Sequence, residues 1–205
     1  GALGGPVART WMTAIIAVAT GYPTSTSNVT VAALTINNGA VLTVTGFRVT
    51  VDVPGGLTIA DGGEMIITDG KSVSLKKGGK IKLDGTITFS GASAGELRLR
   101  SRIGESAVFV IPASTTGKIV GDGTAAGSIV KGPGDIFPVL VVGAGVKILG
   151  KLSIVLTLVN NGIVHADRNG TLSLGCYPTS GNGRWKVSTH TGARMVSSGS
   201  SAGGP

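Results

Sequence analysis

The stretch Leu34-Thr35-Ile36-Asn37-Asn38-Gly39-Ala40-Val41-Leu42-Thr43-Val44 contains two apolar–polar–apolar triplets separated by an Asn-Asn-Gly turn. Such triplets recur about every eight residues as far as Leu99. The copies are Leu34-Thr35-Ile36, Leu42-Thr43-Val44, Val49-Thr50-Val51, Leu57-Thr58-Ile59, Met65-Ile66-Ile67, Val73-Ser74-Leu75, Ile81-Lys82-Leu83, Ile87-Thr88-Phe89 and Leu97-Arg98-Leu99. Nearly every copy has a counterpart 23 or 24 positions further on, as Leu34, Leu57 and Ile81 do. Three short strands in each unit of about 24 residues predict a triangular β-solenoid, a rod of stacked coils.

The alternation within each triplet predicts which side chains fill this rod. Successive residues of a strand point to opposite faces, so Leu34 and Ile36 are expected to point inward and Thr35 outward. Coils stacked about 4.8 Å apart then form columns of side chains. The spacing predicts two outward columns, Thr35–Thr58–Lys82 and Asp52–Lys76–Arg100. We therefore expect an all-β, right-handed parallel β-solenoid of roughly six to eight coils with irregular terminal caps, the hand being that of most parallel crossovers.

The composition fits a single rod-shaped domain. With 205 residues, of which 41% are apolar, the chain can bury a continuous core, and this excludes a disordered protein. Many of the 35 glycines fall between the triplets, where Gly, Asn and Asp suit tight corners. Cys176 is the only cysteine, so no intramolecular disulfide can form. The net charge of +8 favours either an anionic neighbour or simply the solubility of an otherwise apolar rod.

The repeat divides the chain into three parts. Residues 1–28 form a lead-in or capping segment, residues 29–175 the solenoid, and residues 176–205 a Gly/Ser/Thr-rich cap or arm. Between residues 101 and 158 the period blurs, although strands are still expected at 107–111, 118–120, 128–130, 139–142 and 146–149. The run 152–159 is so apolar that we expect it to be buried on both faces or packed against another subunit.

The two ends of a solenoid are sheet edges, which must be capped or paired. The apolar run at residues 11–20 is shorter than the roughly 18 residues of a membrane span, and no other run is long enough, so no transmembrane segment is expected. Because the chain begins at Gly1, we expect a processed N-terminus whose apolar run caps the first coil as helix or strand. The candidate residues for a subunit junction are Trp11, Ile15, Ile16, Val18 and Trp185.

The opening of the repeat carries a resemblance to a known class of proteins. The run 23–31, followed by the run 34–44, resembles the first coils of secreted adhesin-type β-helix proteins and is similar to the passenger domains of bacterial autotransporters. The resemblance covers residues 20–100, and 140–175 more loosely; it implies a β-helix fold and an extracellular setting. Asn28 and Asn169 begin N-glycosylation sequons, which would suit an exported protein.

Two motifs of enzymes occur in incomplete form. The run 139–145 resembles the start of a dinucleotide-binding fingerprint, but Ile148 occupies the place of the third glycine, and a strand is expected where a helix must receive the pyrophosphate. The G-x-S-x-G matches around Ser93 and Ser201 lack the strand-to-helix turn of a nucleophile elbow. We therefore expect no catalytic residues and no cofactor.

Metal-ligating residues are too few and too scattered for a metal site. His165 and His190 are the only histidines, and together with one cysteine they provide no metal-ligand spacing. Four aspartates precede glycine in expected turns, where a calcium site would need several converging oxygens. They are Asp61, Asp69, Asp84 and Asp122. No metal is expected.

A basic cluster falls within two predicted coils. Its candidate contact residues are Lys76, Lys80, Lys82, Arg98, Arg100 and Arg102, with Lys71 and Lys77 beside them. Lys76 and Arg100 should stack about 5 Å apart, which is unfavourable unless Asp52 or an external anion offsets the repulsion. This face would therefore bind a ladder of phosphate or uronate groups, form a salt-bridged subunit contact, or remain solvated. Nucleic acid is not expected, because no aromatic residues are interleaved for base stacking.

The sequence thus favours a structural function over a catalytic one. We expect a non-enzymatic, extracellular subunit of a surface filament or matrix fibre that self-assembles end to end. The alternative is an adhesin or phage-fibre-type module that recognises anionic polysaccharide through the basic face. A polysaccharide lyase or hydrolase with its site in residues 101–158 is a third hypothesis, although the expected outward face offers only Asp52 as an acid.

Overall fold

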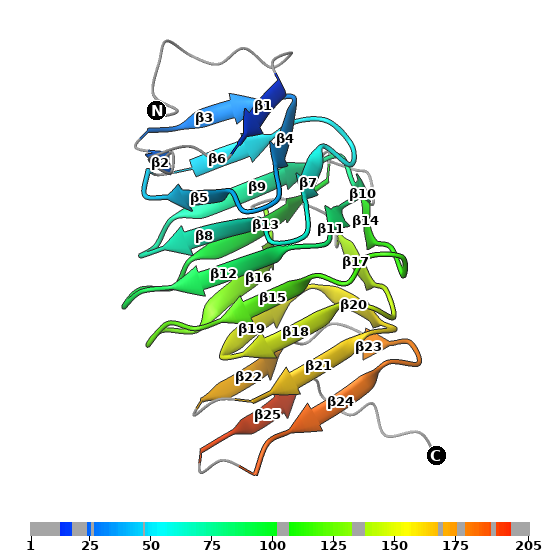
Figure 1. Ribbon diagram of the computed structural model, residues 1–205. Helices are drawn as coiled ribbons and strands as arrows, with labels where there is room; N and C mark the ends of the chain where they lie inside the picture. The colour runs from blue at the N-terminus through cyan, green and yellow to red at the C-terminus, as the bar shows by residue number, and fades with distance from the viewer. Residues whose placement is uncertain are drawn as a thin grey trace.

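The computed structural model describes residues 13–17, 24–25, 27–46, 48–101, 107–132, 138–167, 170–175, 179–189 and 192–197. All regular secondary structure in these ranges is β-strand, and all the pairs between strands are parallel. The strands wind through three faces in a fixed order and form eight coils in the described part of the chain (Figure 1). The predicted parallel β-solenoid is confirmed. The described part contains no helix with the length and apolar character that crossing a membrane requires.

Two of the three faces are sheets of eight strands each. Sheet B consists of β2 (Thr24–Ser25), β5 (Val41–Val44), β8 (Glu64–Thr68), β12 (Thr86–Ser90), β15 (Lys118–Gly121), β18 (Lys147–Gly150), β21 (Ile163–Ala166) and β24 (Arg184–Val187). Sheet C consists of β3 (Val29–Val31), β6 (Arg48–Val51), β9 (Ser72–Lys76), β13 (Glu96–Arg100), β16 (Gly127–Lys131), β19 (Leu152–Val155), β22 (Thr171–Leu174) and β25 (Arg194–Ser197). In Figure 1 the strands of sheet B cross the front from right to left while successive coils descend, so the solenoid is right-handed.

The third face is divided between two shorter sheets. Sheet A consists of β1 (Thr13–Ile16), β4 (Ala33–Ile36), β7 (Leu57–Ile59) and β11 (Lys82–Leu83). Sheet D consists of β10 (Gly79–Lys80), β14 (Val108–Ile111), β17 (Val139–Val142), β20 (Thr157–Asn160) and β23 (Thr179–Ser180).

The change from sheet A to sheet D occurs within one coil. Around Ile81, strand β11 pairs back to β7 and strand β10 pairs forward to β14. The three residues before Lys80 all have positive φ: Lys77 (69°), Gly78 (71°) and Gly79 (102°). A left-handed run of this kind bends the chain out of line. At Gly79 an added Cβ would lie 2.5 Å from the Gly55 nitrogen, so only glycine fits. The face is therefore interrupted at this corner.

The core is made of the inward columns that the sequence predicted. One column in sheet B runs Leu42–Met65–Ile87–Ile119–Ile148–Val164, in which each residue pairs with the next and none is more than 1% exposed. The alternation of buried and half-buried residues is regular in most strands. Each aliphatic side chain thus packs on the equivalent side chains of the coils before and after it.

The repeat is irregular between residues 101 and 158 because the coils there differ in length. The pairs Ile87–Ile119 and Ile119–Ile148 each span a longer stretch of chain than the pairs of the regular repeat do. The pair Ile148–Val164 spans a much shorter one. The strands expected there are confirmed as β14 to β18, because the extra residues enter the corners and leave the strands in register. The run 152–159 is not one doubly buried element: it is divided between β19 and β20 by a corner at Leu156.

Adjacent positions on β15 provide a test of this inward and outward alternation. Ile119→Ala removes a side chain that is fully buried, and we expect it to cost about 2–5 kcal/mol of unfolding free energy. Val120→Ala, the matched control, removes a half-buried outward side chain and should cost no more than about 1 kcal/mol. Denaturant titration followed by circular dichroism measures both; equal losses would contradict the assigned facing of β15.

Candidate functional site

The last coil of the described residues exposes side chains at inward positions. Trp185 and Val187 occupy inward positions, because they pair with the buried residues Val164 and Ala166. Yet Trp185 is 38% exposed and Val187 51% exposed. Strands β23, β24 and β25 form the edges of sheets D, B and C. We call this surface the C-terminal end: it presents apolar side chains inside a triangle of strand edges.

The first coil differs from the last. Ile16 and Val31 also occupy inward positions at the edge of the solenoid, but each is only 3% exposed, so this coil is covered. Ile15, on the outward side of β1, is 64% exposed. Of the residues predicted at a subunit junction, Ile15 and Ile16 thus lie at one end and Trp185 at the other. Trp11 and Val18 lie outside the described residues.

The two ends also differ in charge. The last coil carries three exposed cations, Arg184, Lys186 and Arg194. The described residues of the first coil, 13–17, 24–25 and 27–31, include no charged side chain. Contact between two C-terminal ends would therefore oppose like charges, whereas contact between a last coil and a first coil would not.

The structure divides the predicted basic face between two faces of the solenoid. Lys80 lies on sheet D opposite Val110, and Lys82 on sheet A opposite Thr58; both are exposed. The remaining described members lie on the outer surface of sheet C. They are Lys76, Arg98 and Arg100. Arg102 lies outside the described residues. These cations therefore do not form one continuous face.

On sheet C the charged side chains form a grid three strands wide. We call this grid, the outward residues of β6, β9 and β13 with the adjoining Asp52, the sheet C charged face. Its members are Arg48, Thr50, Asp52, Ser72, Ser74, Lys76, Glu96, Arg98 and Arg100. The predicted stacking of Lys76 on Arg100 is confirmed by the register. Arg48 and Glu96 were not among the residues predicted for this face, although following the repeat from Arg48 leads directly to Ser72 and then to Glu96.

Two carboxylates offset part of the positive charge. The Asp52 carboxylate lies 3.1 Å from Lys76 Nζ and 3.5 Å from Lys77 Nζ. The Glu96 carboxylate accepts a hydrogen bond from Arg98 Nε at 2.5 Å and also pairs with Arg98 Nη2. Because these side chains are partly buried, screening by water and salt is reduced. Asp52 thus provides the offsetting anion that the column of Lys76 and Arg100 requires.

Other residues considered for chemistry have structural partners. Asp69 Oδ1 accepts hydrogen bonds from the backbone N–H groups of Ala92 and Ser93 in the next coil, so Ser93 lies in a turn tied to that carboxylate. His165 Nε2 lies 3.2 Å from Ser188 Oγ, also one coil away. Among the described residues, no group of three or more His, Cys, Asp or Glu side chains is placed to hold a metal ion.

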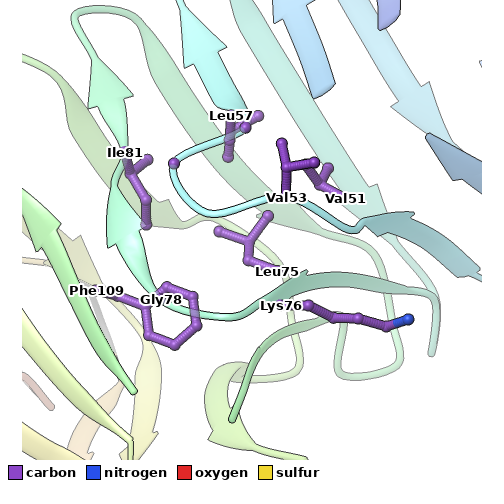
Figure 2. A pocket seen from close by; sticks show the side chains of 10 residues that line it. Val51, Val53, Leu57, Leu75, Lys76, Gly78, Ile81 and Phe109 are labelled. Carbon is purple, nitrogen blue, oxygen red and sulfur yellow. The ribbon is translucent and has the colours of Figure 1, made fainter. Parts of the chain in front are cut away.

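Two hollows are too small to resemble the usual ligand pockets of proteins. A cavity of about 10 Å³ lies in the core where sheets C, A and D meet, surrounded by apolar residues including Leu57, Leu75 and Phe109. It has room for about one water molecule. Figure 2 shows that the Lys76 amine points away from it. A polar groove of about 250 Å³ runs along a corner past Asp61 and Lys118.

Comparison with known proteins does not assign the chain to a family. No family model matches it, and no match was found among curated proteins or solved structures. The fold therefore rests on the strand register and the stacked coils alone, and the resemblance to adhesin-type proteins stays a prediction.

The Asp52 ion pairs generate a prediction about stability. Asp52→Asn leaves Lys76 beside Arg100 without the carboxylate of the preceding coil, and we expect a loss of about 1 kcal/mol of unfolding free energy. The loss should shrink in 1 M salt, where the screening length falls to about 3 Å. The matched control is Asp61→Asn, at an exposed corner where the described residues offer no ion pair. Denaturant titration at both salt concentrations measures it; an unchanged midpoint, or a loss independent of salt, would contradict the role given to Asp52.

Proposed function

We propose that the protein is a non-enzymatic structural subunit that associates end to end into an extracellular filament or matrix fibre. The observation that carries the proposal is the exposure of Trp185 and Val187 at inward positions of the last coil. The preceding coils of the described chain cover such positions with their neighbours. A further coil of the same cross-section would bury the exposed apolar side chains of the last coil most completely.

The geometry of the coil favours a second copy of the chain as that neighbour. All strands are parallel, so a copy placed along the solenoid axis can continue the sheets with unchanged strand direction. Strands β24 and β25 would then meet β2 and β3 of the next copy, and β23 would meet β1. Three strand edges pair at once only if the partner has the same triangular cross-section.

The charges favour one polarity of assembly. Joining two C-terminal ends by two-fold symmetry would place Arg184, Lys186 and Arg194 against their own copies. It would also require antiparallel pairing. Head-to-tail contact avoids the repulsion between like charges, because the described residues of the first coil are uncharged. It also keeps the strand pairing parallel. Head-to-tail contact repeats without closing, and the product is a filament.

The covered first coil adds a step to this assembly. Since Ile16 and Val31 are already buried, whatever covers them must move before a second copy can stack there. Because every subunit carries the same covered first coil, this displacement is required at each addition and should slow the growth of the filament.

The extracellular setting and the lack of enzyme activity belong to the same proposal. The setting rests on the resemblance of the opening coils to secreted adhesin-type proteins and on Asn28, the exposed first residue of a sequon. The non-enzymatic role is supported by the acids, because Asp52, Asp69 and Glu96 are engaged in ion pairs or hydrogen bonds within the solenoid.

Two exposed valines provide a matched test. Val187→Lys places a charge at the proposed junction and should raise the concentration needed for assembly at least about a hundredfold, because a buried charge there would have no partner. Val108→Lys changes a valine that is 46% exposed on the outer surface of sheet D and should leave assembly unchanged. Light scattering over a range of protein concentrations, with electron microscopy of the products, measures both. A wild-type protein that stays monomeric at high concentration, or equal effects of the two variants, would contradict the proposal.

A further inference from the structure

Beyond assembly, the sheet C charged face carries polar groups that its own ion pairs leave unsatisfied. Arg48 Nε and Ser74 Oγ are both buried, and in the described part of the chain neither has a hydrogen-bond partner. They belong to adjacent strands: Arg48 pairs with Ser72, two residues before Ser74 on β9. Diagonal neighbours of this kind have Cβ atoms about 7–8 Å apart, within reach of an arginine side chain. Two polar groups without partners thus occupy one part of the face.

The burial of Ser74 is unusual for its position. Ser74 points outward from the central strand of the grid, between Thr50 and Arg98, yet it is 0% exposed. A buried hydroxyl without a hydrogen bond is unfavourable, and so is a buried guanidinium nitrogen. Arg48 Nε can only donate, and a serine hydroxyl donates readily. The group that would satisfy both is an acceptor.

The charge of the face favours a negatively charged acceptor. Among the described residues, and counting Lys77 beside the grid, this face has five cations and two carboxylates. Asp52 is engaged by Lys76 and Lys77, and Glu96 by Arg98, so neither carboxylate serves Arg48. Arginine binds carboxylate, sulfate and phosphate oxygens through paired N–H donors. The chemistry of this place is therefore that of an oxyanion site.

We propose that the sheet C charged face binds the oxyanion groups of an acidic polysaccharide, with Arg48 and Ser74 at the centre of the site. Cations lie on three successive coils of this face, Arg48 on β6, Lys76 on β9 and Arg98 on β13, and this row suits a polymer with repeated negative groups better than a single ion. The described residues of the face include no aromatic side chain for stacking on nucleic-acid bases. Lys80 and Lys82, on another face, are not part of this site.

Binding of polygalacturonate by the full-length chain tests the proposal. Isothermal titration in 50 mM NaCl should detect binding that weakens strongly in 500 mM NaCl, while neutral dextran should not bind. Arg48→Gln should weaken binding at least about tenfold, the usual loss when a charged hydrogen bond is removed. The matched control, Lys147→Gln, removes one exposed charge from sheet B and should weaken binding less than about threefold.

Two further measurements separate the site from general attraction of charge. Ser74→Ala leaves the net charge unchanged and should still weaken polygalacturonate binding. If circular dichroism shows that Arg48→Gln does not fold, Ser74→Ala tests the site in its place. Inorganic sulfate, titrated alone, should bind far more weakly than the polymer. Equal losses for Arg48→Gln and Lys147→Gln, sulfate binding as tight as that of the polymer, or no binding of polygalacturonate in 50 mM NaCl would each overturn the proposal.

Discussion

The parallel register between successive coils is the constraint on which the rest of the structure depends. An inward residue such as Ile119 is buried because Ile87 and Ile148 lie directly before and after it, and a shift of β15 by one residue would turn Ile119 outward. Each coil therefore stabilises only its neighbours. Coils of unequal length are tolerated because the register fixes the strands and leaves the corners to take up the difference.

The same constraint makes the two ends the places where another chain could most readily bind. A coil without a neighbour exposes both apolar side chains and strand edges, and exposed edges pair with other chains unless they are protected. The first coil is covered, whereas the last coil exposes Trp185 and Val187 and carries cations on its outer positions. In the proposed assembly these cations would oppose contact between two C-terminal ends and leave head-to-tail contact unopposed.

Much of the fold could be predicted from the sequence, because the triplets report the strands directly. The spacing of Leu34, Leu57 and Ile81 indicated the coil length, and the column of Lys76 and Arg100 followed from the same spacing. The division of the third face could not be predicted, since it depends on the φ angles of Lys77, Gly78 and Gly79. The candidate sites were harder to predict from the sequence. Lys80 was grouped with Lys76 because the two are close in sequence, although a corner separates them. Arg48 was omitted, because its Nε is recognised as unsatisfied only when its burial is known.

Electron cryomicroscopy of the assembled protein tests the proposal that the stacking of coils continues from one subunit to the next. Eight coils at about 4.8 Å each span roughly 38 Å, so the account predicts unbranched filaments with that axial rise per subunit and continuous parallel sheets across the junction. Filaments whose subunits meet side by side, or pairs of molecules joined by two C-terminal ends, would contradict it.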